Sequence, residues 1–290
     1  MTLLGDAKNA PLTPEFVESM QATLALQAIR VIRSHWLAPR IACDLYIEGG
    51  DPASYGRVLS EAVEDQPYDA VVQPIELRRK KLLISDMDST MITVECIDEL
   101  ADFVGKKAEV SVITERAMNG ELDFPSALRE RVALLKGLPE AVLEECYRER
   151  VRMMPGAKAL VSGMRAAGAH CVLVSGGFTF FTSRVAAELG FHEEYANTLI
   201  VQDGKLTGEV AEPILGKEAK LAALLESCKR LGITAAEALA VGDGANDLPM
   251  LLAAGLGVAY HAKPVVRAQA AAQINHGDLS GLLWAQGITN

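Results

Sequence analysis

The stretch LLISDMDST, residues 82–90, joins a short apolar run to two aspartates that are separated by a single residue. The apolar part is typical of a buried strand, and this strand should end where Asp86 and Asp88 begin. Ligands of open parallel sheets collect outside the carboxyl ends of the strands, so polar groups at this place indicate chemistry. Two carboxylates held close together repel each other unless a cation neutralises them. Mg²⁺ is a hard cation that suits such oxygen ligands.

An aspartate beside Mg²⁺ can attack phosphorus and carry the phosphoryl group as an aspartyl-phosphate. A plain polar turn is the competing interpretation, because Asp and Ser are frequent in turns. A calcium-binding loop fails, since it needs Gly at the sixth position and Glu at the twelfth, where Met91 and Ile97 stand. The motif therefore needs support from the rest of the chain.

The composition indicates a globular protein with room for one large domain or two modest ones. Of its 290 residues, 50% are hydrophobic and 23% are charged. The net charge of -10 argues against a nucleic-acid partner but allows an anionic small-molecule substrate. The five cysteines are scattered, as expected for reduced thiols in a cytoplasmic protein. We expect no signal peptide, no membrane-spanning segment and no membrane partner.

Residues 1–80 show the order βαββαβ, which predicts a small ferredoxin-like α+β domain. Strands are expected at 2–4, 29–35, 41–47 and 68–75, with helices from Thr13-Pro14 onward and at 52–63. This topology resembles the ACT domain, a module that binds amino acids or pairs subunits. It leaves open an amino-acid sensor, a homodimer formed through this domain, and a purely structural role. The basic run at 78–81 is expected to be a solvent-exposed linker.

From residue 82 onward, predicted strands alternate with predicted helices. This pattern is typical of a Rossmann-like, doubly wound parallel sheet, here in a domain spanning 81–290. One segment breaks the alternation, because about residues 94–152 are helical throughout. We expect this segment to be a helical cap inserted above the strand ends.

Two more predicted strand ends carry polar groups. The apolar run at 170–174 leads to SGG at 175–177, which offers a hydroxyl and bare backbone N–H groups to a phosphate, although it is also a common tight turn. The strand at 238–241 runs into GDGAND at 242–247, which looks like the other half of a metal site. Between these two, Lys220 lies on a predicted helix and could reach the site, although a helix lysine is usually exposed.

The four motifs together resemble those of the haloacid dehalogenase superfamily of phosphohydrolases. They are DMDST at 86–90, Ser175, Lys220 and GDGAND at 242–247. Within the superfamily the chain is similar to the phosphoserine phosphatases, over about residues 82–275. The resemblance implies Mg²⁺-dependent hydrolysis of O-phospho-L-serine to L-serine and phosphate, the last step of L-serine biosynthesis.

The resemblance also implies the roles of the acidic residues. Asp86 is the nucleophile and a metal ligand. Asp88 binds the metal through its backbone carbonyl, so its side chain is free to act as general acid and then as general base. Asp243 completes the ligands that the protein gives to Mg²⁺.

A second group of residues is implied to hold the phosphoryl group. Ser175, the Gly176 N–H and Lys220 place positive charge and donors where negative charge develops in the transition state. Asn246 helps to position the same group. Asp247 supports the metal ligands from outside.

The cap is implied to select the substrate. A carboxylate calls for a bidentate arginine and an ammonium for a carboxylate, which by position are Arg131 and Glu95. The alternative for Arg131 is an exposed helix charge, because 129–131 are all charged and two of them must face away. Met118 and Phe124 would line the closed site, or serve only as cap core.

Two further functions stay open on the sequence. One is the same fold acting on another small phosphate ester, as a phosphatase or as a phosphotransferase to an alcohol. The other is a non-catalytic amino-acid sensor, against which the complete set of catalytic residues argues.

Overall fold

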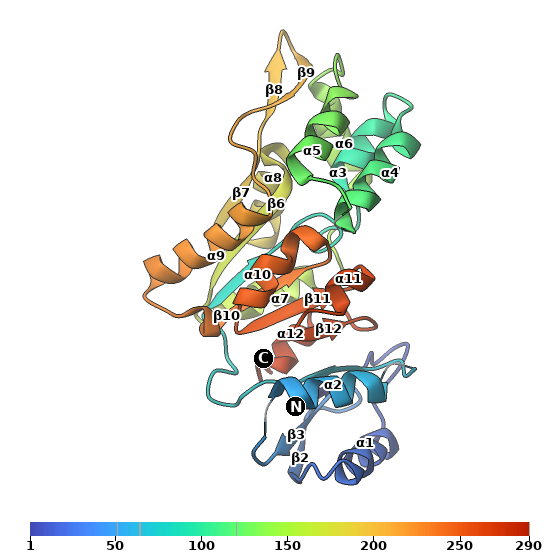
Figure 1. The fold of residues 1–290 in the computed structure, drawn as a ribbon, viewed down its shortest axis with the longest axis vertical. Coiled ribbons are helices and arrows are strands. Elements are labelled where there is room, and N and C mark those ends of the chain that lie inside the picture. The colour runs from blue at the N-terminus through green and yellow to red at the C-terminus, as the bar shows by residue number, and fades with distance from the viewer. Residues whose placement is uncertain (51, 64, 120, 290) are drawn as a thin grey trace.

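Six parallel strands form the sheet against which the rest of the chain packs (Figure 1). The computed structural model describes residues 1–50, 52–63, 65–119 and 121–289. Across the sheet the strands are β12 (Ala272–Ile274), β11 (Leu256–Tyr260), β10 (Ala238–Gly242), β5 (Leu82–Ser85), β6 (His170–Phe178) and β7 (Glu193–Asn197). Every neighbouring pair is parallel, so all six carboxyl ends lie on the same edge.

Helices cover both faces of this sheet, because alternate residues of each central strand enter two different cores. Leu83 belongs to one core and Ile84 to the other. The first core also contains residues of α7 (Ala157–Ala166), α8 (Thr179–Leu189) and α12 (Gly281–Ala285). The second contains residues of α9 (Lys217–Leu231), α10 (Leu248–Ala253) and α11 (Pro264–Arg267). Strands buried on both faces are continuously apolar, and the predicted doubly wound α/β class is confirmed.

The first 71 residues form a separate four-stranded antiparallel sheet with two helices. Its elements are β1 (Thr2–Leu4), α1 (Pro14–Leu26), β2 (Val31–Ala38), β3 (Ala42–Ile47), α2 (Pro52–Val63) and β4 (Asp69–Val71). The strand order β2-β3-β1-β4 is that of the predicted ferredoxin-like fold, which is therefore confirmed. Thr13 caps α1, since its hydroxyl accepts the Phe16 N–H at 3.2 Å.

The last strand of this sheet is shorter than the predicted strand at 68–75. It ends at Val71, and Gln73 instead donates to the carbonyl of Ala285 at 2.8 Å. Pro74 has no N–H to give to a neighbouring strand, so the strand pattern could not continue through it. The predicted domain boundary near residue 80 falls in the segment between β4 and β5.

One carboxylate of the N-terminal sheet binds directly to the larger domain. Asp69, which is buried, accepts the backbone N–H groups of Asn275, His276 and Gly277, at 2.7 Å for the first and the last. These residues directly follow β12. Leu4 and Val71 also belong to the core that contains the larger domain's helices. The two domains thus share apolar packing as well as hydrogen bonds.

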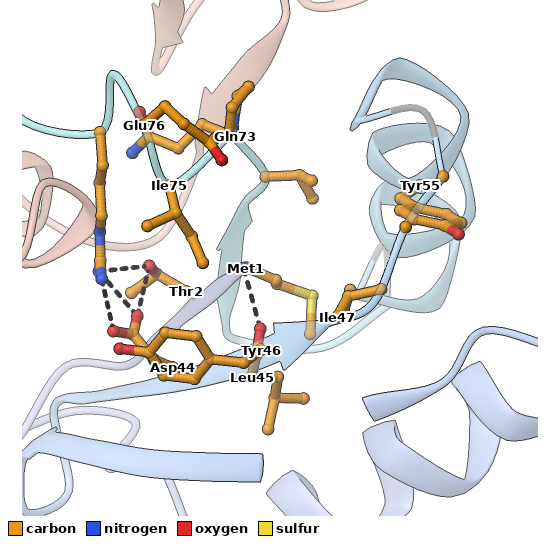
Figure 2. A pocket seen from close by; sticks show the side chains of 15 residues that line it. Met1, Thr2, Asp44, Leu45, Tyr46, Ile47, Tyr55, Gln73, Ile75 and Glu76 are labelled. Carbon is orange, nitrogen blue, oxygen red and sulfur yellow. Dashed lines mark hydrogen bonds and ion pairs between the residues drawn. The ribbon is translucent and has the colours of Figure 1, made fainter. Parts of the chain in front are cut away.

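A second contact between the domains contradicts the expected exposed linker at 78–81. Arg78 donates two hydrogen bonds of 2.7 Å to Asp44 of β3 and also binds the carbonyls of Trp284 and Ala285. Figure 2 shows Asp44 beside Thr2 in the pocket that this contact borders. Lys80 is buried too, and its ammonium donates to the carbonyl of Ala236 at 3.0 Å. The prediction was wrong for Arg78 and Lys80, because a charged side chain can leave water when the fold supplies its partners, whereas Arg79 and Lys81 are exposed as expected.

The predicted helical cap stands above the carboxyl ends of the strands. It consists of α3 (Cys96–Asp102), α4 (Lys107–Met118), α5 (Phe124–Ala133) and α6 (Ala141–Arg150). A hairpin, β8 (Leu199–Gln202) and β9 (Lys205–Val210), leaves the sheet and runs beside the cap (Figure 1). Backbone bonds of 2.8 and 2.9 Å join Leu206 of this hairpin to Gly137 and Leu138 of the cap. Among the described residues, none of the helices is long and apolar enough to cross a membrane.

Candidate active site

Three of the sequence motifs meet at the centre of the sheet edge. Asp86 follows β5, Ser175 lies in β6 and Asp243 follows β10, and β5 pairs with both of the other strands. The cap closes over this edge and leaves a small cavity of about 20 Å³. The cavity is lined by Asp86, Asp88, Glu95, Ile97, Met118, Phe124, Leu128, Arg131, Ser175, Gly176, Gly177, Phe178 and Asn246. Predicted residues from the sheet edge and from the cap therefore face one enclosed space.

Three buried carboxylates form a group suited to a cation. Asp86, Asp243 and Asp247 each place one oxygen within 4.8 Å of the others. The Oδ1 atom of Asn246 is also buried and has no partner among the described residues. An all-oxygen set with an unsatisfied amide oxygen nearby fits a hard divalent cation. The residues of this site can therefore hold a metal ion.

Lys220 partly neutralises these acids. Its ammonium lies 2.7 Å from Asp86 Oδ1 and 2.6 Å from Asp247 Oδ1, and the side chain is buried. Burial by itself would lower the pKa of Lys220, but the charges of Asp247 and Asp86 raise it above its ordinary value. The lysine is therefore charged, and the predicted helix lysine does reach the site.

The acids outnumber the cation, so their ionisation is suppressed. Burial, followed by the charge of Asp247, raises the pKa of Asp86 to about 7. Burial, followed by the charges of Glu95 and Asp86, raises the pKa of Asp243 well above its ordinary range. A divalent cation would relieve this repulsion, which is a second physical reason to expect one here.

Asp88 is held in one orientation by two donors. Its Oδ1 accepts the Cys96 N–H at 2.9 Å and its Oδ2 accepts the Ser175 hydroxyl at 3.2 Å. A Cβ at Gly177 would lie 2.7 Å from Asp88 Oδ2, so this loop must approach as bare backbone. Burial raises the pKa of Asp88 in spite of these hydrogen bonds.

The cap contributes a buried positive group and a half-buried acidic group to the cavity. Arg131 is 2% exposed, and it uses two of its five N–H donors on Ala127 O and Thr114 Oγ1. Glu95 Oε1 accepts the Ser89 hydroxyl at 2.5 Å. Burial, followed by the charge of Asp88, raises the pKa of Glu95 to about 8. The structure places Arg131 inward, whereas Arg129 and Glu130 are exposed.

Met118 and Phe124 lie between the cap and the loops below it. A Cβ at Gly176 would come within 2.5 Å of Phe124 Cζ, and one at Gly244 within 2.5 Å of Met118 Sδ. Both cap side chains therefore rest on glycines of the sheet edge. Both side chains also line the cavity.

The comparisons with known proteins agree with this geometry. A family model described as haloacid dehalogenase-like hydrolase matches residues 83–252. The chain belongs to the haloacid dehalogenase-like hydrolases. It is 52% identical over 214 residues to a phosphoserine phosphatase of Polaromonas sp. (strain JS666 / ATCC BAA-500), covering 72% of this chain and 91% of that protein.

Solved structures of related hydrolases extend the likeness to the fold. A HAD family hydrolase from Salmonella enterica serovar Typhi has a TM-score of 0.82 at 32% identity and covers 98% of this chain and 96% of its own. A phosphoserine phosphatase structure described as a phospho-aspartyl intermediate analogue has a TM-score of 0.68 at 40% identity, covering 71% of this chain and 98% of that one. The first likeness includes the N-terminal domain.

Sequence reasoning missed several residues that support the hydrolase site. Thr90, in the quoted motif, donates its hydroxyl to Asp243 Oδ1 at 3.1 Å. Asp98 accepts the hydroxyls of Ser111 and Thr114 at 2.6 Å, and Thr114 in turn binds Arg131. Thr90 could have been found from its place beside Asp88, but nothing in the local pattern marks Asp98.

Proposed function

We propose that this chain is a Mg²⁺-dependent phosphoserine phosphatase, which hydrolyses O-phospho-L-serine to L-serine and phosphate. The observation that carries the proposal is the enclosed cavity, in which Asp86 and Asp88 face Glu95 and Arg131 of the cap. Asp86 and Asp88 suit phosphoryl transfer, and Glu95 and Arg131 suit binding of the ammonium and carboxylate of an amino acid. The similar proteins named phosphoserine phosphatase support the same substrate.

In the proposed reaction a carboxylate oxygen of Asp86 attacks phosphorus while the bond from phosphorus to the serine oxygen breaks. Asp88 gives its proton to the departing serine oxygen, so L-serine leaves as the neutral alcohol. Asp88, now ionised, takes a proton from water, and that water attacks the phosphorus of the aspartyl-phosphate. Phosphate leaves and Asp86 is regenerated. The raised pKa of Asp88 and its fixed orientation suit both proton transfers.

The remaining residues hold the phosphoryl group. Ser175, the Gly176 N–H and Lys220 provide donors and positive charge, and Asn246 offers its amide from the opposite loop. Mg²⁺ would be held by Asp86, Asp243 and the backbone carbonyl of Asp88, where it would neutralise charge on the phosphoryl oxygens. Asp247 would orient this set, since its Oδ2 accepts the N–H groups of Asp243 and Gly244.

The cap would recognise the amino-acid part of the substrate. Arg131 has three N–H donors without a partner among the described residues, enough for a bidentate bond to the carboxylate. Glu95 would bind the ammonium, and that charge would return the pKa of Glu95 toward its ordinary value. Met118 and Phe124 would exclude water from the closed site.

Phosphate release tests this function directly. O-phospho-L-serine and a panel of other phosphomonoesters are assayed with Mg²⁺ and with EDTA. We expect a strong preference for phosphoserine that EDTA abolishes, and no turnover by Asp86→Asn although it stays folded. Phosphate release from all the esters at similar rates would contradict the assignment of phosphoserine as the substrate. Transfer to an added alcohol in place of water would make the chain a phosphotransferase, and no release from any ester would favour the amino-acid sensor.

We also propose that two copies of the chain associate through the N-terminal domain in the cytoplasm. The strand β2 is an eight-residue edge strand, and its Ile32 side chain is 55% exposed. All five cysteines are buried free thiols, which suits a reducing compartment. Light scattering of the full chain and of Ile32→Asp tests the association, and a monomeric wild-type chain would contradict it.

A further inference from the structure

The peptide group between Gly176 and Gly177 is fixed at both of its ends. The Gly177 N–H donates to Ser175 Oγ at 2.8 Å, and the carbonyl of Gly176 accepts from Asn197 Nδ2 at 2.8 Å. The Ser175 hydroxyl then donates to Asp88 Oδ2 at 3.2 Å. Two successive glycines have wide backbone freedom, so this loop needs such external contacts to keep one conformation. Asn197 supplies the contact on the carbonyl side.

Asn197 makes a second connection from the same amide. It ends β7, is 2% exposed, and is not among the residues that line the cavity. Its Oδ1 accepts the Leu215 N–H at 2.7 Å, and its Nδ2 also donates to the Leu215 carbonyl at 3.2 Å. Leu215 precedes Gly216, which caps the helix α9 that carries Lys220. One side chain therefore joins the backbone at the end of β6, residues 175–177 (the serine loop), to the start of α9, which carries Lys220.

The hydrogen bonds also distinguish the oxygen from the nitrogen of the Asn197 side-chain amide. The oxygen meets one N–H, and the nitrogen meets two carbonyl oxygens. A reversed amide would set its oxygen against two carbonyls, so the assignment follows from the surrounding backbone. Only asparagine combines this acceptor and these two donors at this length. Aspartate would keep the acceptor and lose both donors.

We propose that Asn197 is a positioning residue for phosphoryl transfer, which acts by holding the Gly176 carbonyl and the Leu215 backbone. It sets the separation between Ser175 and Gly176 on one side and Lys220 on the other, the groups proposed to hold the phosphoryl oxygens. The inference rests on the proposed function of those groups. A purely structural role is the alternative, because buried carbonyls need a donor wherever they occur.

The two roles differ in what a substitution changes. Loss of a purely structural bond lowers the melting temperature and leaves kcat unchanged in the folded protein. Loss of a positioning bond lowers kcat for every phosphate ester, because it displaces phosphoryl-binding groups and leaves the cap pocket intact. We expect Asn197→Ala and Asn197→Asp to lower kcat about 10- to 100-fold, a loss comparable to that of one transition-state donor. The same factor should apply to phosphoserine and to O-phosphoethanolamine.

The experiment measures kcat, KM and the melting temperature of both variants well below their unfolding range. Thr198→Ala is the matched control, because Thr198 is the exposed neighbour in sequence and, among the described residues, its side chain hydrogen-bonds only to Thr179. A kcat within twofold of wild type in either folded variant would overturn the inference. A double-mutant cycle with Ser175→Ala adds a second criterion. Positioning predicts that the two losses combine to less than their product, and independent losses would overturn it.

Binding of inorganic phosphate in the presence of Mg²⁺, measured by calorimetry, separates this inference from the proposed function. Weaker phosphate binding by Asn197→Ala than by Thr198→Ala supports the inference even if phosphoserine is not the substrate. Equal phosphate affinity in wild type and Asn197→Ala would overturn it. If the wild-type chain does not hydrolyse phosphoserine, only the proposed substrate is overturned, and the role of Asn197 is not.

Discussion

Replacing Arg131 by methionine tests the cap pocket most sharply, because the side chain keeps an unbranched apolar stem and loses the guanidinium with its charge and donors. Arg131 is 2% exposed and spends two of its five N–H donors on Ala127 and Thr114. The three that remain are enough to bind both oxygens of a substrate carboxylate. The variant removes that interaction and leaves Asp86 and Asp88 in place.

The size of the effect follows from the bonds lost. A hydrogen bond to a charged group contributes about 1.5–3 kcal/mol, and the pair is bidentate. Part of the free energy of these two bonds is offset by the cost of removing water from the charged groups. We therefore expect the variant to lose about 3 kcal/mol of transition-state binding. Since about 1.4 kcal/mol corresponds to a factor of ten, kcat/KM for phosphoserine should fall roughly 100-fold or more in Arg131→Met.

The assay compares two substrates that differ in one group. O-phospho-L-serine carries the carboxylate, and O-phosphoethanolamine lacks it while keeping the ammonium and the phosphate. Arg131→Met should lose activity on the first and change little on the second. Arg129→Met is the control, because Arg129 is 54% exposed and pairs with an exposed Glu212, so a change below twofold is expected. An equal loss on both substrates would refute carboxylate recognition and make Arg131 a support of the cap.

Three further predictions address the loop, the domain contact and the acids. Gly177→Ala should lower kcat at least tenfold, because its Cβ would lie 2.7 Å from Asp88 Oδ2; unchanged kinetics would contradict the proposed orientation of that acid. Asp69→Ala should destabilise the fold by about 3 kcal/mol, since three N–H groups of the larger domain lose a buried acceptor; an unchanged melting curve would contradict this. Without metal, the pKa of Asp86 is about 7 and that of Glu95 about 8, both above the value near 4 of an unfolded carboxyl group. The stability that these two protonated groups contribute is therefore complete at low pH and is lost as pH rises from about 4 to about 8. In EDTA the melting temperature should fall between pH 5 and pH 8.5. In Glu95→Gln this fall should be smaller than in the wild-type chain. Mg²⁺ should raise the melting temperature most at the higher pH. A melting temperature in EDTA that does not change with pH would contradict the raised pKa values.

The sequence by itself determined the strand framework and the groups at its edge. The strand Leu82–Ser85 begins with three apolar residues and is followed by Asp86, and apolar runs likewise precede Ser175 and Asp243. Periodicity of this kind is a local property, so it can be recognised without knowing what packs against the strand. Because parallel strands end on one edge, the meeting of the three motifs also followed from the sequence.

The tertiary structure decided which partners the charged side chains have. Nothing local distinguishes Arg131 from Arg129, or Lys80 from Lys81, yet only the first of each pair is buried. Arg131 binds Ala127 of its own helix, but its other partner, Thr114, belongs to α4, and the partner of Lys80, Ala236, lies 156 residues away in sequence.

Asn197 is the extreme case, because it has no motif around it and its partners lie 18 and 21 residues away in sequence. A buried polar side chain must find partners wherever the packed elements supply them. Those partners exist only once β7, the serine loop and the start of α9 have come together.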